Sequence, residues 1–161
     1  MALNLIDIFK SSHKNAQLFD ALKSIDFHKT RSQSKSLKLI EFETPSPIEL
    51  KITRHNDFDI PASAQKFISN PVLLMETWDF MSQSKIKVIL AIPKIQTEVT
   101  ADLNFEELGA ETVITVNSHV VSEMFLVGSF VEEFVSKFWK NALNKDFETL
   151  NSWITTNQTF D

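Results

Sequence analysis

The stretch that decides the fold is SFVEEFVSKFWKNALNKDFETLNSWI, residues 129–154. It contains no proline or glycine, and its apolar residues recur at intervals of three and four, the spacing of one face of an α-helix. Ser129 and Glu132 have the spacing of a capping box, which marks a helix start. At 1.5 Å per residue, such a helix extends roughly 35–40 Å. We therefore predict a terminal helix long enough to cross a whole sheet.

The region before this helix shows the two-residue period of β-strands. Apolar and polar residues alternate in several runs, as expected for an antiparallel sheet with one buried face. The predicted strands are residues 3–9, 37–43, 48–54, 73–80, 85–91, 95–105 and 111–121. Pro45 and Pro47 indicate a turn, and Gly109 indicates a tight connection with positive φ. The sequence thus predicts an antiparallel sheet followed by a helix.

The remaining segments are less regular. Residues 15–24 have helical spacing, whereas the polar stretch 28–36 is compatible with either a second short helix or a loop. Residues 62–68 follow Pro61 and could form one or two helical turns. No repeat or internal linker interrupts the chain, so we expect one α+β domain over residues 1–155 and a frayed tail over 156–161.

Composition restricts the classes of protein that remain. The 161 residues include 14 Phe and 3 Trp but no Tyr. We therefore expect these rings to be shielded from water, either in a Phe-rich core or in the walls of an apolar cavity. The formal charge of −5 argues against nucleic-acid binding. The chain has no cysteine, no secretory signal and no run of roughly 18 apolar residues that could span a membrane. We therefore expect a cytoplasmic protein without an integral membrane segment.

Several motifs in the second half carry a family resemblance. They are Glu76-Thr77-Trp78, Ala91-Ile92-Pro93, VTADL at 99–103, ETVITV at 111–116, Leu126-Val127-Gly128 leading into Val131-Glu132, and Trp153. Over residues 58–155 the chain resembles the START-like (SRPBCC, helix-grip) superfamily, and most nearly the DUF2505 family of unknown function. The terminal helix also resembles that of mitochondrial PRELI-type phospholipid carriers. The resemblance implies a helix-grip fold, in which a curved antiparallel sheet of about six to seven strands wraps around the C-terminal helix.

The resemblance also implies a range of functions. Superfamily members bind lipids, sterols, polyketides or plant hormones between sheet and helix, while others are cyclases, hydrolases or co-chaperone domains. We expect binding or transport of a small apolar ligand, a lipid or a polycyclic compound. The alternatives are a protein-interaction domain with a filled core and an apolar patch at Met124, Phe125 and Leu126, or a cyclase- or hydrolase-like enzyme. A non-enzymatic role is favoured over the enzyme.

Candidate ligand-binding residues lie on the surfaces expected to face each other. On the helix, Phe130, Phe134 and Phe138 recur at i, i+4 and i+8 and so share one side. The candidates on the sheet are Leu50, Ile52, Trp78, Leu90, Val99, Ala101, Ile114, Val116 and His119. His119 is either a polar anchor at the cavity end or a solvent-facing strand residue. The two surfaces could also close on each other as a solid core.

Few polar residues suggest chemistry. Glu76 and Trp78 share a strand face, and Glu76 with Arg54 could hold a ligand head group inside an apolar pocket. We expect instead a surface cross-strand pair. The histidines lack metal-pair spacing, and the chain has two glycines and no nucleophile motif. We therefore predict no metal, no cofactor and no catalytic residue, and leave the oligomeric state open.

Overall fold

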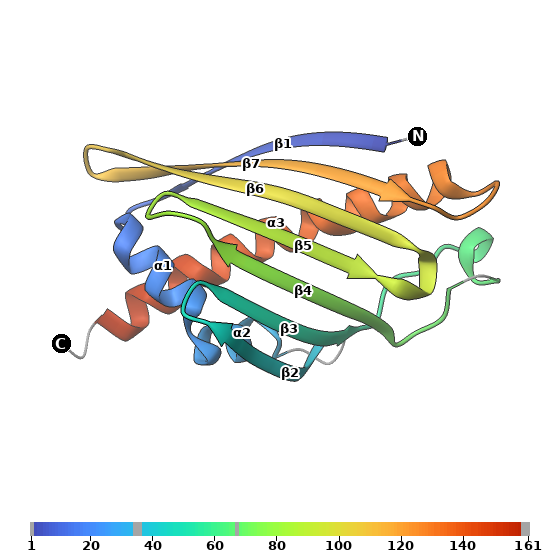
Figure 1. Cartoon of the computed structure of the whole chain (residues 1–161), viewed down its shortest axis with the longest axis horizontal. Coiled ribbons are helices and arrows are strands. Elements are labelled where there is room, and N and C mark those ends of the chain that lie inside the picture. Colours follow the sequence, from blue (N-terminus) through green and yellow to red (C-terminus); the bar gives the residue numbers. More distant parts are fainter. Residues whose placement is uncertain (1, 34–36, 67, 159–161) are drawn as a thin grey trace.

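The computed structural model describes residues 2–33, 37–66 and 68–158 (Figure 1). Within these residues seven strands form one antiparallel sheet in the order β1-β7-β6-β5-β4-β3-β2. The elements are β1 (Ala2–Ser11), α1 (Asn15–Lys23), α2 (Ile25–Arg31), β2 (Leu37–Ser46), β3 (Glu49–Asn56), η1 (Ala62–Ala64), β4 (Val72–Phe80), β5 (Lys85–Ile92), η2 (Pro93–Ile95), β6 (Thr97–Leu108), β7 (Glu111–Ser122) and α3 (Gly128–Gln158). The long helix α3 crosses one face of the curved sheet, which confirms the predicted α+β architecture.

Alternating side chains place the core between α3 and the sheet. Along β6 the residues Val99, Ala101 and Leu103 are buried, while those between them face outward, as the sequence predicts. Trp139 of α3 donates its indole N–H to Ser118 Oγ of β7 at 2.7 Å. Because an indole N–H in the interior needs an acceptor, this bond fixes the position of the helix on the sheet.

The long helix differs from the prediction at both ends. It runs to Gln158, so residues 156–158 are helical rather than frayed, and residues 159–161 lie outside the described part. The predicted capping box is wrong. Glu132 lies a turn inside the helix, almost completely buried, and its Oε2 accepts the backbone N–H of Ser122 at 2.9 Å. No described helix is both long and apolar enough to cross a membrane.

The first half of the chain also corrects some expectations. The described part of the polar stretch forms the end of helix α2, with residues 34–36 outside the description. β2 continues through Pro45, where a turn was predicted, because an edge strand tolerates a residue without a backbone N–H. Ile48 lies before β3 and is 55% exposed, so it does not continue the buried face. Of residues 62–68, only η1 is helical, and Phe67 lies outside the described residues.

The β6–β7 hairpin offers a test of the backbone. Gly109 has φ of 64°, and a Cβ at this position would have nothing within 4 Å. A Gly109→Ala variant therefore isolates the backbone cost, which we expect to lower the free energy of unfolding by about 1–2 kcal/mol. Urea denaturation measures this value. Gly109→Asn should lose less, because asparagine tolerates the left-handed conformation, and equal losses in both variants would contradict the explanation.

Candidate functional site

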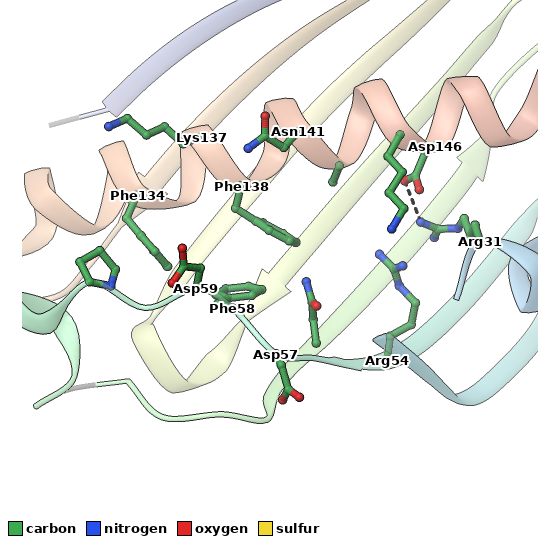
Figure 2. Close-up of a pocket in the computed structure, with 14 residues that line it drawn as sticks. Arg31, Arg54, Asp57, Phe58, Asp59, Phe134, Lys137, Phe138, Asn141 and Asp146 are labelled. Carbon is green, nitrogen blue, oxygen red and sulfur yellow. Dashed lines mark hydrogen bonds and ion pairs between the residues drawn. The ribbon is translucent and has the colours of Figure 1, made fainter. Parts of the chain in front are cut away.

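An open pocket of about 470 Å³ lies between α3 and the segment that follows β3. One end of the pocket is aromatic. The ring of Phe58 lies 4.4 Å from that of Phe138 and 5.7 Å from that of Phe134, measured between centroids (Figure 2). Asn70 holds Phe58 in place, because its side-chain amide bonds both the N–H and the C=O of Phe58 at 2.8 and 2.9 Å. This end thus presents an apolar surface with a fixed backbone.

The other end of the pocket is charged. Arg31 from α2, Arg54 from β3 and Asp146 from α3 meet there, as Figure 2 shows. Arg31 Nη1 donates to Asp146 Oδ2 at 3.0 Å. Both arginines are 5% exposed, and they are the only arginines in the chain. The pocket therefore joins an aromatic end to a strongly polar end along one side of α3.

Glu76 lies beneath this end and holds the arginines together. Its Oε1 accepts hydrogen bonds from Arg31 Nη2 and from Trp78 Nε1, the latter at 2.9 Å. Arg54 Nη2 lies 2.5 Å from Oε2 and forms an ion pair with it. Glu76 is 4% exposed, so the expected surface pair with Arg54 is wrong. Both residues occupy the inner face because Arg54 follows Leu50 and Ile52 in the alternation of β3.

The charges of this cluster control its protonation. Burial alone raises the pKa of Glu76, but Arg31 and Arg54, with the Trp78 hydrogen bond, outweigh it and lower the pKa to about 2. Burial raises the pKa of Asp146 above its usual range, against the opposing effect of Arg31. The pKa of Arg31 rises because Glu76 and Asp146 overcome its burial. At neutral pH, Glu76 is therefore ionised and is a very weak base, unsuited to proton abstraction.

His28 supports the cluster from α2. Its Nδ1 accepts a hydrogen bond from Arg31 Nε at 2.9 Å, so Nε2 carries the proton and donates to the carbonyl of Leu22 at 2.6 Å. Burial, and then the charge of Arg31, lower the pKa of His28 to about 3. The imidazole is therefore neutral at pH 7 and has both nitrogens engaged. It positions Arg31 and is not accessible from the pocket.

Between the sheet and α3 themselves the space is nearly filled. A gap of about 30 Å³ remains, bounded by Trp78 and Leu90 from the sheet and by Trp139 and Leu143 from the helix. This volume holds about one water molecule. Arg31 and Arg54 border both this inner gap and the open pocket. The volume available to a ligand thus lies beside α3 rather than under it.

The structure divides the predicted ligand-binding residues other than His119 into four groups. Phe134 and Phe138 line the open pocket, and Trp78 and Leu90 line the inner gap. The residues buried in the core that border neither space are Leu50, Ile52, Val99, Ala101, Ile114 and Val116. Phe130, in the first turn of α3, is 38% exposed and lies outside the pocket, because the facing wall begins at Phe134.

His119 is the clearest correction. It is exposed on the outer face of β7, where its Nδ1 lies 2.6 Å from Asn4 Oδ1 of β1. The alternation that turns Val116 and Ser118 inward turns His119 outward. It therefore cannot anchor a ligand between sheet and helix. Among the described residues, no group of three or more His, Asp or Glu side chains is placed to hold a metal ion.

Sequence reasoning missed Arg31, His28, Phe58 and Asp146. Asp146 had a usable signal, because it continues the i, i+4 line through Phe134, Phe138 and Ala142. The α2 residues had a weaker one, since Phe27, His28 and Arg31 are buried along one side of a seven-residue helix. Phe58 lies in an irregular segment, where periodicity gives no direction for its side chain.

The fold and pocket define a helix-grip α+β protein with a site beside its terminal helix. The model of the family described as "Protein of unknown function (DUF2505)" matches residues 10–154, and the chain belongs to this family. No curated protein matches the sequence significantly.

Solved structures share the fold at low identity. The Zhui aromatase/cyclase from Streptomyces sp. R1128 superposes with a TM-score of 0.69 at 8% identity, covering 96% of this chain and 94% of that one. Ara h 8.0201 superposes with a TM-score of 0.68 at 11% identity, covering 97% of this chain and 99% of that one. SA2116 from Staphylococcus aureus is a protein of unknown function. It superposes with a TM-score of 0.67 at 10% identity, covering 99% of this chain and 97% of that one. These likenesses establish the helix-grip fold of this chain.

The low pKa of His28 predicts a loss of stability in weak acid. In the unfolded chain His28 binds a proton below about pH 6.5, whereas in the folded protein it binds one only near pH 3. The free energy of unfolding should therefore fall as pH drops below about 6.5, by at most about 1.4 kcal/mol per pH unit from this residue. Glu76 adds a further loss as pH falls below 4.5 towards 2. Urea denaturation between about pH 7 and 5 measures this loss, which the raised pKa of Asp146 opposes.

A pair of variants tests whether His28 causes this pH dependence of the free energy of unfolding. His28→Gln should be less stable than the wild type at neutral pH, because it disturbs the bonds to Arg31 and Leu22, yet change less with pH across that window. His119→Gln, which removes a histidine from the outer face, should keep the wild-type slope. An unchanged slope in His28→Gln would show that other groups cause the acid sensitivity.

Proposed function

We propose that this protein binds or transports a small apolar ligand, a lipid or a polycyclic compound, in the open pocket beside α3. The observation that carries the proposal is the convergence of Phe58, Phe134 and Phe138 on a pocket of about 470 Å³. That volume lies in the range of small-molecule sites. Aromatic walls with a few polar groups at one end suit a molecule that is mostly apolar.

The fold comparisons support the proposal in a general way. The neighbour from Streptomyces is named an aromatase/cyclase. Its identity to this chain is 8%, so the name suggests the proposal without transferring a substrate. The polar groups behind this pocket also favour binding over catalysis, because the low pKa of Glu76 makes it a very weak base and both nitrogens of His28 are engaged.

A substitution that takes up space in the pocket should weaken binding. Phe134→Trp adds bulk at the aromatic end, and we expect affinity to fall about tenfold or more, since added volume in a packed site typically costs 1–3 kcal/mol. Phe130→Trp is the matched control: it makes the same change one turn earlier on α3, outside the pocket. Native mass spectrometry with a panel of fatty acids, phospholipids and polycyclic compounds measures both. Equal binding by the two variants would place the ligand elsewhere.

The wild-type protein supplies the first result of the same experiment. Protein purified gently from its expression host should carry an apolar molecule in defined stoichiometry. A clean apo mass that no member of the panel changes would reject the proposal and favour a protein-interaction domain. The side chains available for that alternative are Phe125 and Leu126, which are 87% and 89% exposed, whereas Met124 is partly buried against the core.

A further inference from the structure

We infer that the ligand is an amphiphilic anion, whose carboxylate or phosphate head binds Arg54 at the charged end of the pocket while its apolar body lies along Phe58, Phe134 and Phe138. This inference rests on the proposed function and specifies its ligand class. It starts from the unequal partners of the two arginines. Arg31 donates to Glu76, Asp146 and His28. Arg54 has one ion-pair contact, with Glu76.

Arg54 therefore retains unused capacity. Its Nε is buried without a hydrogen-bond partner among the described residues, although the residue is only 5% exposed. A guanidinium taken out of water normally satisfies its donors, since an unmade bond from a charged group is costly. Arg54 borders the pocket, and Figure 2 shows its guanidinium directed across the charged end towards α3. An oxyanion lying in the pocket would pair with the part of the Arg54 guanidinium that borders it.

The local charge favours an anion at this position. Burial, and then the positive charge of Arg31, lower the pKa of Arg54 against the opposing charges of Glu76 and Asp146. In the described structure Arg54 forms an ion pair with Glu76, whereas Asp146 pairs with Arg31. Two other carboxylates line the pocket, but in Figure 2 Asp57 points away from Arg54 and Asp59 lies towards the aromatic end. Neither forms an ion pair with Arg54 in the described structure.

The shape of the pocket sets the rest of the ligand. Along α3 it extends from Phe134 to Asp146, twelve residues, or about 18 Å at the helical rise. Ala142 also lines the pocket, falls between Phe138 and Asp146 along α3, and adds little bulk. A chain or ring system attached to the head group would therefore contact Phe138, Phe58 and Phe134 in turn. A head group without an apolar body would leave these rings uncovered.

Calorimetric titration of the wild-type protein with three probes of equal chain length tests the inference, at concentrations below micelle formation. Dodecanoate or dodecyl phosphate should bind about tenfold or more tightly than dodecanol, because hydrogen bonds to a charged group contribute that much. The tighter of the two anions distinguishes a carboxylate from a phosphate ligand. Equal affinity of all three would overturn the anionic head group and leave the apolar pocket standing. If none of them bound, the inference would fall, and the mass-spectrometry panel would decide separately whether the proposed function falls with it.

A pair of variants locates the head group. In the Arg54→Gln variant the affinity for the preferred anion should fall to that for dodecanol, with both affinities measured on the same variant. Lys140→Gln removes the same charge from α3 outside the pocket, where Lys140 lies 3.9 Å from Asp7, and should bind the anion like the wild type. An anion preference that survives in Arg54→Gln would overturn the assignment to Arg54. The three-probe comparison uses only wild-type protein, so it holds even if the Arg54 variant folds poorly.

Discussion

Glu76 brings both arginines of the chain into the interior, and this buried cluster constrains the position of the elements around it. Arg31 comes from α2, Arg54 from β3 and Asp146 from α3, so one carboxylate on β4 indirectly connects four segments. A buried ion pair adds little net stability over a well-packed apolar core, because desolvation offsets the attraction. Removing one partner of the pair strongly destabilises the protein, since it leaves an uncompensated charge in the interior. The cluster thus acts mainly by disfavouring every arrangement in which these elements separate.

The cluster also explains why the pocket lies beside α3. His28, itself bonded to the carbonyl of Leu22, holds the guanidinium of Arg31 in place, and Arg31 then reaches Asp146 on α3. This contact closes one end of the space along the helix. At the other end, Asn70 holds Phe58 against Phe134 and Phe138. The pocket is therefore bounded by two independently fixed walls, one charged and one aromatic.

The fold could be predicted from sequence because period and composition carry that information locally. The alternation of β6 and the helical period of residues 129–154 each require one buried face, and the structure follows both. Strict alternation along β7 also places His119 on the face of the strand opposite to that of Val116. The exposure of His119 could therefore have been derived from the same pattern. The predicted capping box was wrong because the partner of Glu132 is the backbone of Ser122, ten residues earlier. The spacing of residues within the helix carries no information about that contact.

The site was harder to predict, since it depends on pairs of residues far apart in the chain. Arg31 and Glu76 are separated by 45 residues and Arg31 and Asp146 by 115, and no local pattern connects them. A helix-grip fold supplies two facing surfaces but does not decide whether the interior between them is hollow. Here Trp78, Trp139 and Leu143 fill it to a gap of about 30 Å³, and the larger volume opens where Ala142 leaves room next to Phe138. Phe138 borders both spaces and is only partly buried, so its ring belongs at once to the wall of the open pocket and to the edge of the filled core.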